Sequence, residues 1–187
     1  MSIDPMQLPS LNLDPVPDEW PFSIDAKASA VLALFMLDHE QRPCLLFTRR
    51  ASEMRSHAGQ VGFPGGRREV YDVNPAATAL REAYEEIGLI EHTVTVLGMS
   101  KPLRSIDSKP VLPIVATTDA LLSQLKPNPD EVAEIFLVPW TALTQAHRTV
   151  VRFNIFGKWR ETPFYEANGH NIWGLTAWMV EQLSLRE

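Results

Sequence analysis

The chain has 187 residues, of which 45% are hydrophobic and 21% are charged. These values are typical of one globular domain, and they exclude a globally disordered chain. No apolar run approaches the roughly 20 residues that a membrane-spanning helix needs. Seventeen Lys and Arg against 23 Asp and Glu give a net charge of −6. A long nucleic acid is therefore not expected as a partner, because binding it requires a basic surface.

The first residues and the cysteine content indicate the compartment. The N-terminal segment MSIDPMQLPS lacks a basic region followed by an apolar stretch, so no secretory signal is expected. Cys44 is the single cysteine, which excludes an internal disulfide and a thiolate metal cluster. Both features predict a cytoplasmic protein.

Prolines are concentrated at the start of the chain. Five of the 15 lie within the first 21 residues: Pro5, Pro9, Pro15, Pro17 and Pro21. Because proline lacks an amide proton and favours extended neighbours, we expect an irregular arm over residues 1–27 and one domain over residues 28–187. The arm packs either on the body of the domain or on a partner subunit.

Strands and two helices are expected after the arm. The apolar runs SAVLALFML and PCLLFTRR, separated by DHEQ, predict two strands joined by a turn. A helix is predicted from Pro75, with Asn74 as its N-cap and Gly88 as its end. Another helix is expected over Ile172–Leu185. Further strands are expected at Thr93–Met99, Val111–Ala116, Ile135–Val138 and Val150–Phe156. This order favours a layered, mixed α/β domain.

The central helix carries three carboxylates on one side. At 100° per residue, Glu82, Glu85 and Glu86 share an arc of about 100°. Arg81 lies one turn before Glu85, where an i,i+4 ion pair can form. The apolar stripe expected to face the core consists of Ala76, Leu80, Ala83 and Ile87.

Two interpretations of these acids compete. In the first, they form a solvated surface whose repulsion Arg81 reduces. In the second, they hold divalent cations, whose charge reverses the repulsion. The preceding run FPGGRREVYD favours the second interpretation, because it turns the backbone sharply and brings carbonyls and acids close to the first helical turns.

The stretch Gly66–Leu89, GRREVYDVNPAATALREAYEEIGL, resembles the Nudix box, a loop–helix–loop motif. That motif has Gly, a later Glu, then Arg-Glu, an apolar residue and Glu-Glu before Gly. The early acid here is Asp72 instead of Glu, and eight residues instead of seven separate it from Arg81.

The upstream stretch LLFTRRASEMRSHAGQVGFPGG resembles the signature of the coenzyme A pyrophosphatase branch of Nudix hydrolases. That branch commonly carries the same one-residue extension of the box, although it usually has Asp where Glu69 stands. The run Trp173–Ala177 also resembles this branch. The matching positions upstream are Thr48, Arg49, Arg55, Gly59, Phe63, Pro64, Gly65, Gly66 and Glu69.

The resemblance implies a Nudix-type α/β/α sandwich with a mixed sheet between helices. It implies a hydrolase that cleaves the diphosphate of coenzyme A or its thioesters to 4′-phosphopantetheine and adenosine 3′,5′-bisphosphate. Two alternatives stay open: another nucleoside diphosphate derivative as substrate (ADP-ribose, a dinucleotide or a nucleoside triphosphate), or a non-catalytic domain that senses a nucleotide. A homodimer would agree with the resemblance and with the proline-rich arm.

The resemblance also implies roles for the acids. Glu82, Glu85 and Glu86 would hold Mg²⁺ or Mn²⁺, and Glu82 or Glu86 would also take a proton from water. Arg81 would brace Glu85. The cation would further contact a backbone carbonyl of Gly65 or Gly66, which also lie against the substrate.

Basic residues are expected to bind substrate phosphates, because arginine can donate to two oxygens at once. The motif assigns this role to Arg49 and Arg55, whereas Arg50 is expected to be a surface arginine paired with an acid, and His57 is undecided. We expect Asp72 to cap or pair near the start of the helix. Glu131 and Glu134 are either solvated acids or additional metal ligands. His39, His92, His147 and His170 have no ligand spacing and are expected to be structural or exposed.

Overall fold

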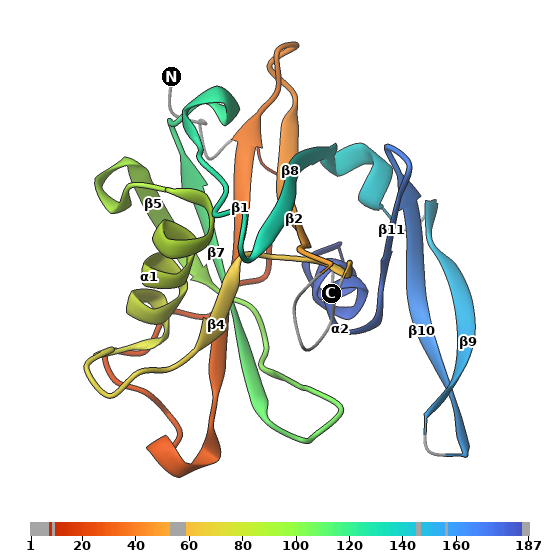
Figure 1. Cartoon of the computed structure of the whole chain (residues 1–187), viewed down its shortest axis with the longest axis horizontal. Helices are drawn as coiled ribbons and strands as arrows, with labels where there is room; N and C mark the ends of the chain where they lie inside the picture. The colour runs from red at the N-terminus through yellow and green to blue at the C-terminus, as the bar shows by residue number, and fades with distance from the viewer. Residues whose placement is uncertain (1–7, 9, 53–58, 145–146, 156, 185–187) are drawn as a thin grey trace.

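The computed structural model describes residues 8, 10–52, 59–144, 147–155 and 157–184. A mixed sheet of eight strands lies between two layers (Figure 1). Helix α1 (Pro75–Ile87) covers one face, and helix α2 (Gly174–Ser184) covers the other together with a three-stranded sheet. This arrangement confirms the predicted α/β/α sandwich with a mixed sheet. None of the described helices is long and apolar enough to cross a membrane.

The central strand β1 (Ser29–Leu37) runs parallel to β7 (Pro110–Thr118) and antiparallel to β2 (Pro43–Arg50). The main path of the sheet has the order β3-β2-β1-β7-β5, while β4 pairs with β1, β6 with β7 and β8 with β2. The remaining strands of this sheet are β3 (Val61–Gly62), β4 (Gly65–Arg67), β5 (Val94–Met99), β6 (Leu103–Arg104) and β8 (Val132–Pro139). The short 3₁₀ helices are η2 (Ile24–Ala26), η3 (Glu91–Thr93), η4 (Leu122–Gln124) and η5 (Trp140–Leu143).

Strand β1 is apolar along almost its whole length because both faces of the sheet are covered. Ala33 and Phe35 belong to the core cluster that includes α2. Leu32 and Leu34, which alternate with them, belong to the cluster that includes α1. Side chains of successive strand residues point to opposite faces, so β1 contributes to two cores at once.

The C-terminal layer differs from the prediction. Its sheet consists of β9 (Thr149–Ile155), β10 (Lys158–Ala167) and β11 (His170–Trp173) in the order β11-β10-β9. The helix predicted from Ile172 begins two residues later, at Gly174. Ile172 and Trp173 belong to β11 instead, because they pair with β10. Strand β10 was not predicted at all.

The described part of the arm packs on the body of the domain. Asp14 exchanges two backbone hydrogen bonds with Met99 at the end of β5, at 2.9 and 2.8 Å. Trp20 is buried in the same core cluster as α1. Gly98 permits this approach, since a Cβ atom there would lie 2.8 Å from the carbonyl oxygen of Asp14.

Candidate active site

Helix α1 begins and ends where local sequence signals place it. The Asn74 side chain accepts a hydrogen bond of 2.9 Å from the Ala77 amide, and Pro75 opens the first turn. Gly88 closes the helix in the left-handed conformation, with φ of 67°. Ala83 and Ile87 are completely buried, as predicted for the apolar stripe. Core packing on this side therefore fixes which residues of α1 face the loop that precedes the helix.

Strand β4, which leads into that loop, requires glycine at two consecutive positions. Gly65 has φ of +151°, and a Cβ atom there would lie 2.5 Å from the carbonyl oxygen of Ala30 in β1. A Cβ atom on Gly66 would lie 2.5 Å from the carboxylate of Glu82. The backbone at Gly65 and Gly66 therefore runs directly against the acidic side of α1, as the FPGG run suggests.

Glu86 is the most enclosed of the three acids. The residue is 4% exposed, and its Oε2 accepts a hydrogen bond of 3.1 Å from the Gly65 amide. Burial raises the pKa of Glu86 to about 7, and the charges of Glu82 and Glu131 act in the same direction. The Gly65 amide and Arg50 oppose this rise only in part. A carboxylate at this position is therefore costly unless a cation lies close to it.

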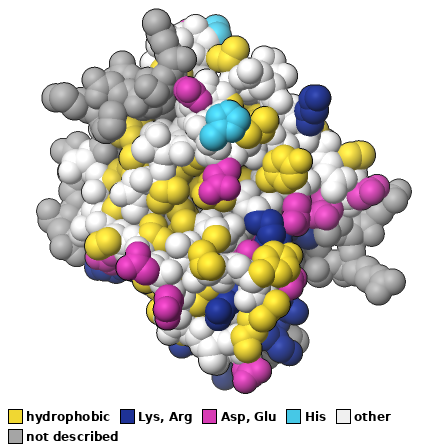
Figure 2. Space-filling view, turned by 90° about the vertical axis from the view of Figure 1, so that its left-hand side faces the viewer, with side chains coloured by type: hydrophobic (Ala, Val, Ile, Leu, Met, Phe, Trp, Pro, Cys, Tyr) yellow, Lys and Arg dark blue, Asp and Glu magenta, His cyan; other side chains and the backbone are white. Residues whose placement is uncertain are grey.

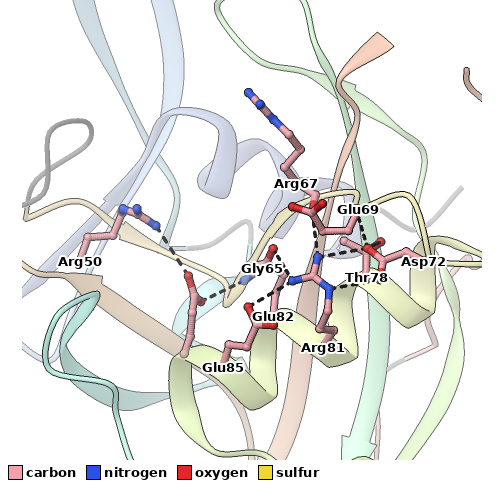
Figure 3. Close-up of polar contacts among 10 residues, drawn as sticks. Arg50, Gly65, Arg67, Glu69, Asp72, Thr78, Arg81, Glu82 and Glu85 are labelled. Carbon is pink, nitrogen blue, oxygen red and sulfur yellow. Dashed lines mark hydrogen bonds and ion pairs between the residues drawn. The ribbon is translucent and has the colours of Figure 1, made fainter. Parts of the chain in front are cut away.

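Arg81 organises the remaining acids (Figure 3). Its Nη1 lies 3.0 Å from Glu82 and 3.2 Å from Glu85, which confirms the predicted pair with Glu85. The Arg81 guanidinium also donates hydrogen bonds to Asp72 through Nε and Nη2, each at 3.1 Å. Its Nη2 donates a further hydrogen bond to the backbone carbonyl of Arg67. The pKa of Glu82 is raised, chiefly by burial, although Arg81 counteracts this effect.

Asp72 is a structural residue at the start of α1, as predicted. Its Oδ2 accepts hydrogen bonds from the Thr78 hydroxyl at 2.7 Å and from the Glu69 amide at 2.8 Å. Burial alone would raise the pKa of Asp72, but the hydrogen bonds from Arg81, Glu69 and Thr78 outweigh burial and lower it. Asp72 thus ties the preceding loop to the helix through Arg81.

The oxygen donors of this surface suit a hard divalent cation. Glu82 and Glu86 face the Gly65–Gly66 backbone, and both have raised pKa values, chiefly because burial disfavours the charged carboxylate. Among the described residues, no three His, Cys, Asp or Glu side chains converge on one point, and Arg81 contacts both Glu82 and Glu85. A cation held by Glu82 would therefore compete with Arg81 for that carboxylate.

The two consecutive arginines of β2 have different partners. Arg49 donates from Nε to Glu134 of β8 at 3.0 Å, whereas Nη1 of Arg50 lies 3.7 Å from Oε1 of Glu86. Arg50 is paired with an acid, as expected, but that acid is Glu86, the most enclosed acid of the site.

Other predicted residues lie near this surface or outside the described residues. Arg55 and His57 lie outside the residues that the structure describes. Glu131 is close enough that its charge raises the pKa values of Glu82 and Glu86, whereas Glu134 is engaged by Arg49. The structure thus brings Glu131, and not Glu134, toward the acids of α1.

The outer side of α1 is more hydrophobic than the side that carries the acids. Figure 2 shows hydrophobic side chains gathered on this face of the molecule. Tyr84 of α1 and Ile90, just beyond the end of the helix, are 62% and 50% exposed. A shallow hollow of about 380 Å³ lies here, and its lining residues are Ala77, Leu80, Arg81, Tyr84, Ile90 and Glu91. Since it contains none of the three acids of α1, we do not place the reaction there.

Comparisons with known proteins show which sequences this chain resembles. The NUDIX domain model matches residues 26–156. The chain is 44% identical over 144 residues to "Uncharacterized Nudix hydrolase NudL" of Photorhabdus laumondii, covering 76% of each chain. It is 40% identical over 152 residues to the protein of the same name from Pectobacterium atrosepticum, covering 77% of this chain and 75% of the relative.

Solved structures agree at the level of the fold. The Nudix hydrolase RenU from M. smegmatis has a TM-score of 0.50 and 22% identity, over 62% of this chain and 72% of that one. A MutT/nudix family protein from Enterococcus faecalis has a TM-score of 0.51 and 14% identity, over 94% of this chain and 62% of that one. At these identities, the likeness shows the fold alone.

Proposed function

Because the chain belongs to the Nudix hydrolase family, we propose that it cleaves the diphosphate of coenzyme A or of its thioesters. The products would be 4′-phosphopantetheine and adenosine 3′,5′-bisphosphate. The observation that supports this substrate is the signature from Thr48 to Glu69, which resembles that of coenzyme A pyrophosphatases. One residue of this signature, Gly65, donates its backbone amide to Glu86 of α1.

The acids of α1 would hold the cofactor, Mg²⁺ or Mn²⁺. Glu82 and Glu86 are the principal ligands in this proposal, with Glu85 and a carbonyl of Gly65 or Gly66 as further ones. A divalent cation bound there supplies Lewis acidity toward phosphate oxygens and lowers the pKa of coordinated water. Arg81 holds Glu85 and, through Asp72, keeps the loop against the helix.

The proton of the attacking water would pass to a carboxylate of the same helix. Glu82 and Glu86 are both assigned to this role as alternatives, since each is enclosed and has a raised pKa. Arg50 adds a positive charge beside Glu86, where it favours binding of an anionic diphosphate. Arg49 and Arg55 are proposed to contact substrate phosphates, and a cytoplasmic location is part of the same proposal.

A panel of diphosphates tests the substrate. Coenzyme A, dephospho-coenzyme A, ADP-ribose, a dinucleoside polyphosphate and ATP would be incubated with the protein and Mg²⁺ or Mn²⁺, and the products identified by mass spectrometry. We expect kcat/KM for coenzyme A to exceed that for the other compounds by about tenfold or more.

Other results would replace the proposal. A preference for ADP-ribose, a dinucleotide or a triphosphate would keep the chemistry and change the substrate. Binding of nucleotides, seen as a thermal shift, without any product would indicate a sensor domain. Sedimentation analysis of the same preparation tests whether the protein is a homodimer.

A further inference from the structure

Glu134 of β8 bridges two residues that are far apart in the sequence. Its Oε2 accepts a hydrogen bond of 3.0 Å from Nε of Arg49, and its Oε1 lies 3.2 Å from Nε2 of His170. Arg49 and Glu134 are direct neighbours across the β2–β8 pair, whereas His170 opens β11 in the C-terminal sheet. The two oxygens of one carboxylate therefore join the main sheet to the C-terminal layer. His170 also lies beyond residues 26–156, the part that the family model matches.

The His170 ring is held in place by a column of aromatic side chains. It stacks on Phe136 with ring centroids 3.8 Å apart and an angle of 14° between the planes. Phe136 stacks in turn on Phe47 of β2, and Phe47 stacks on Phe63 of the FPGG run. The column ends at Phe63, two residues before Gly65 of β4. His170 is thus fixed relative to the candidate active site, although it belongs to a separate sheet.

Arg49 uses only part of its donor set in this arrangement. Its side chain is 39% exposed. Within the part of the chain that the structure describes, its contact with Glu134 is made through Nε, and neither terminal nitrogen has a hydrogen bond or ion pair. A guanidinium held by Nε alone keeps the two terminal groups available for an oxyanion.

We propose that Glu134 and His170 are positioning residues that hold the Arg49 guanidinium ready for a substrate phosphate. This inference rests on the proposed function, because it assigns the free end of Arg49 to the substrate. The carboxylate fixes the guanidinium by its Nε, and His170 fixes the carboxylate from the other side. The C-terminal sheet thereby contributes to substrate binding without touching the acids of α1.

The test is a set of binding cycles with ADP, the part that coenzyme A, ADP-ribose and adenine dinucleotides share. Calorimetry in Mg²⁺ would compare the wild type with Arg49→Ala, Glu134→Ala, His170→Ala and the double variants that include Arg49→Ala. We expect Arg49→Ala and Glu134→Ala each to weaken binding about tenfold, and His170→Ala about threefold. In the Arg49→Ala background, the other two substitutions should each add less than about twofold, because they act through Arg49.

Two further variants separate positioning from a general loss of structure. Glu134→Gln keeps an oxygen acceptor and should recover most of the binding lost in Glu134→Ala. Glu161→Ala removes the carboxylate from another cross-strand pair, Arg152–Glu161 at 2.8 Å, and should leave ADP binding unchanged. With coenzyme A as substrate, Glu134→Ala should raise KM and leave kcat within about twofold.

Several results would overturn the inference. The first is a wild-type protein that does not bind ADP, and the second is normal ADP binding by Glu134→Ala. The third is that the Glu134 and His170 substitutions weaken ADP binding equally in the wild type and in the Arg49→Ala background. A fall in kcat at constant KM would also contradict it. The ADP cycles decide the matter without turnover, so a failure of the coenzyme A assay counts against the proposed function alone.

Discussion

Glu86 is the residue on which the proposed chemistry depends most, because it is buried, faces the Gly65 amide and lies beside Arg50. We predict that Glu86→Gln lowers kcat for coenzyme A by about 10²–10⁴-fold, since it removes a cation ligand and a candidate proton acceptor. The neutral amide keeps the shape of the side chain and removes a charge whose burial is unfavourable. Steady-state kinetics and thermal unfolding would be measured together.

A matched substitution controls for loss of a carboxylate in general. Glu166 in β10 is exposed, and Glu166→Gln should keep wild-type kinetics. Near-normal turnover by Glu86→Gln at saturating Mg²⁺ would remove Glu86 from the reaction.

Gly66 is predicted to be required for the position of Glu82. A methyl group on Gly66 would lie 2.5 Å from the Glu82 carboxylate, so Gly66→Ala must displace that side chain. We expect kcat/KM to fall by at least about tenfold, because sub-ångström placement of a cation ligand affects the rate strongly. Kinetics of Gly66→Ala would be compared with those of Gly62→Ala.

Gly62 offers the control because a Cβ atom there would meet only Thr176 Oγ1 at 3.5 Å, an ordinary contact. Gly62→Ala should therefore stay within about twofold of the wild type. Equal activity of the two variants would show that Glu82 has no fixed position in the working enzyme.

At the scale of the element, helix α1 is tied to its preceding loop by one buried acid. Asp72 accepts hydrogen bonds from Arg81, Thr78 and the Glu69 amide, and it is 4% exposed. We predict that Asp72→Asn lowers the free energy of unfolding by about 2 kcal/mol, as expected for charged hydrogen bonds lost inside a protein. Urea unfolding at pH 7 checks this value. Asp107→Asn, at an exposed ion pair with Lys109, should lower the free energy of unfolding by less than about 1 kcal/mol.

The stabilisation from Asp72 depends on pH in a defined direction. The pKa of Asp72 is lower in the folded protein than its ordinary value of about 3.9. Its contribution is therefore fully present above that value and is lost as the pH falls through the folded-state pKa. We predict that the wild type and Asp72→Asn differ most near pH 7 and converge in acid. A difference that grows on acidification would contradict this assignment.

The limits of sequence reasoning also appear at this scale. Helix α1 was predicted with its N-cap and its end, because Asn74, Pro75 and Gly88 act locally. The pair formed by Arg81 and Glu85 follows from helical spacing in the same way. The predicted start of α2 was wrong by two residues. Ile172 and Trp173 belong to β11 because they pair with β10, and local sequence does not reveal that partner strand.

Contacts between elements were the part that sequence could not supply. Arg50 meets Glu86 because β2 presents it to α1, and no spacing within either element predicts that contact. The contact of His170 with Glu134 likewise depends on how the C-terminal sheet packs on the main one. The sequence thus allowed chemical roles to be predicted for individual residues. Which residues contact one another could be identified only from the folded structure.

At the scale of the whole molecule, the arm is part of the core. Trp20 is 8% exposed, and the Arg68 guanidinium lies 5.3 Å from the centroid of its ring. We predict that Trp20→Ala lowers the free energy of unfolding by about 3 kcal/mol, as for other large-to-small core substitutions. Trp159→Ala, at a tryptophan that is 70% exposed, should change it little. Equal stability of both variants in urea would show that the arm is not anchored through Trp20.

Cation binding is the central claim, because both the acid cluster and the proposed hydrolysis depend on it. The direct measurement is a calorimetric titration of Mn²⁺, with ADP present, into the wild type, Glu86→Gln and the exposed control Glu166→Gln. The wild type and the control should bind Mn²⁺ with the same affinity, and Glu86→Gln should bind it at least about tenfold more weakly. Absence of Mn²⁺ uptake by the wild type, or equal affinity in all three proteins, would contradict the account.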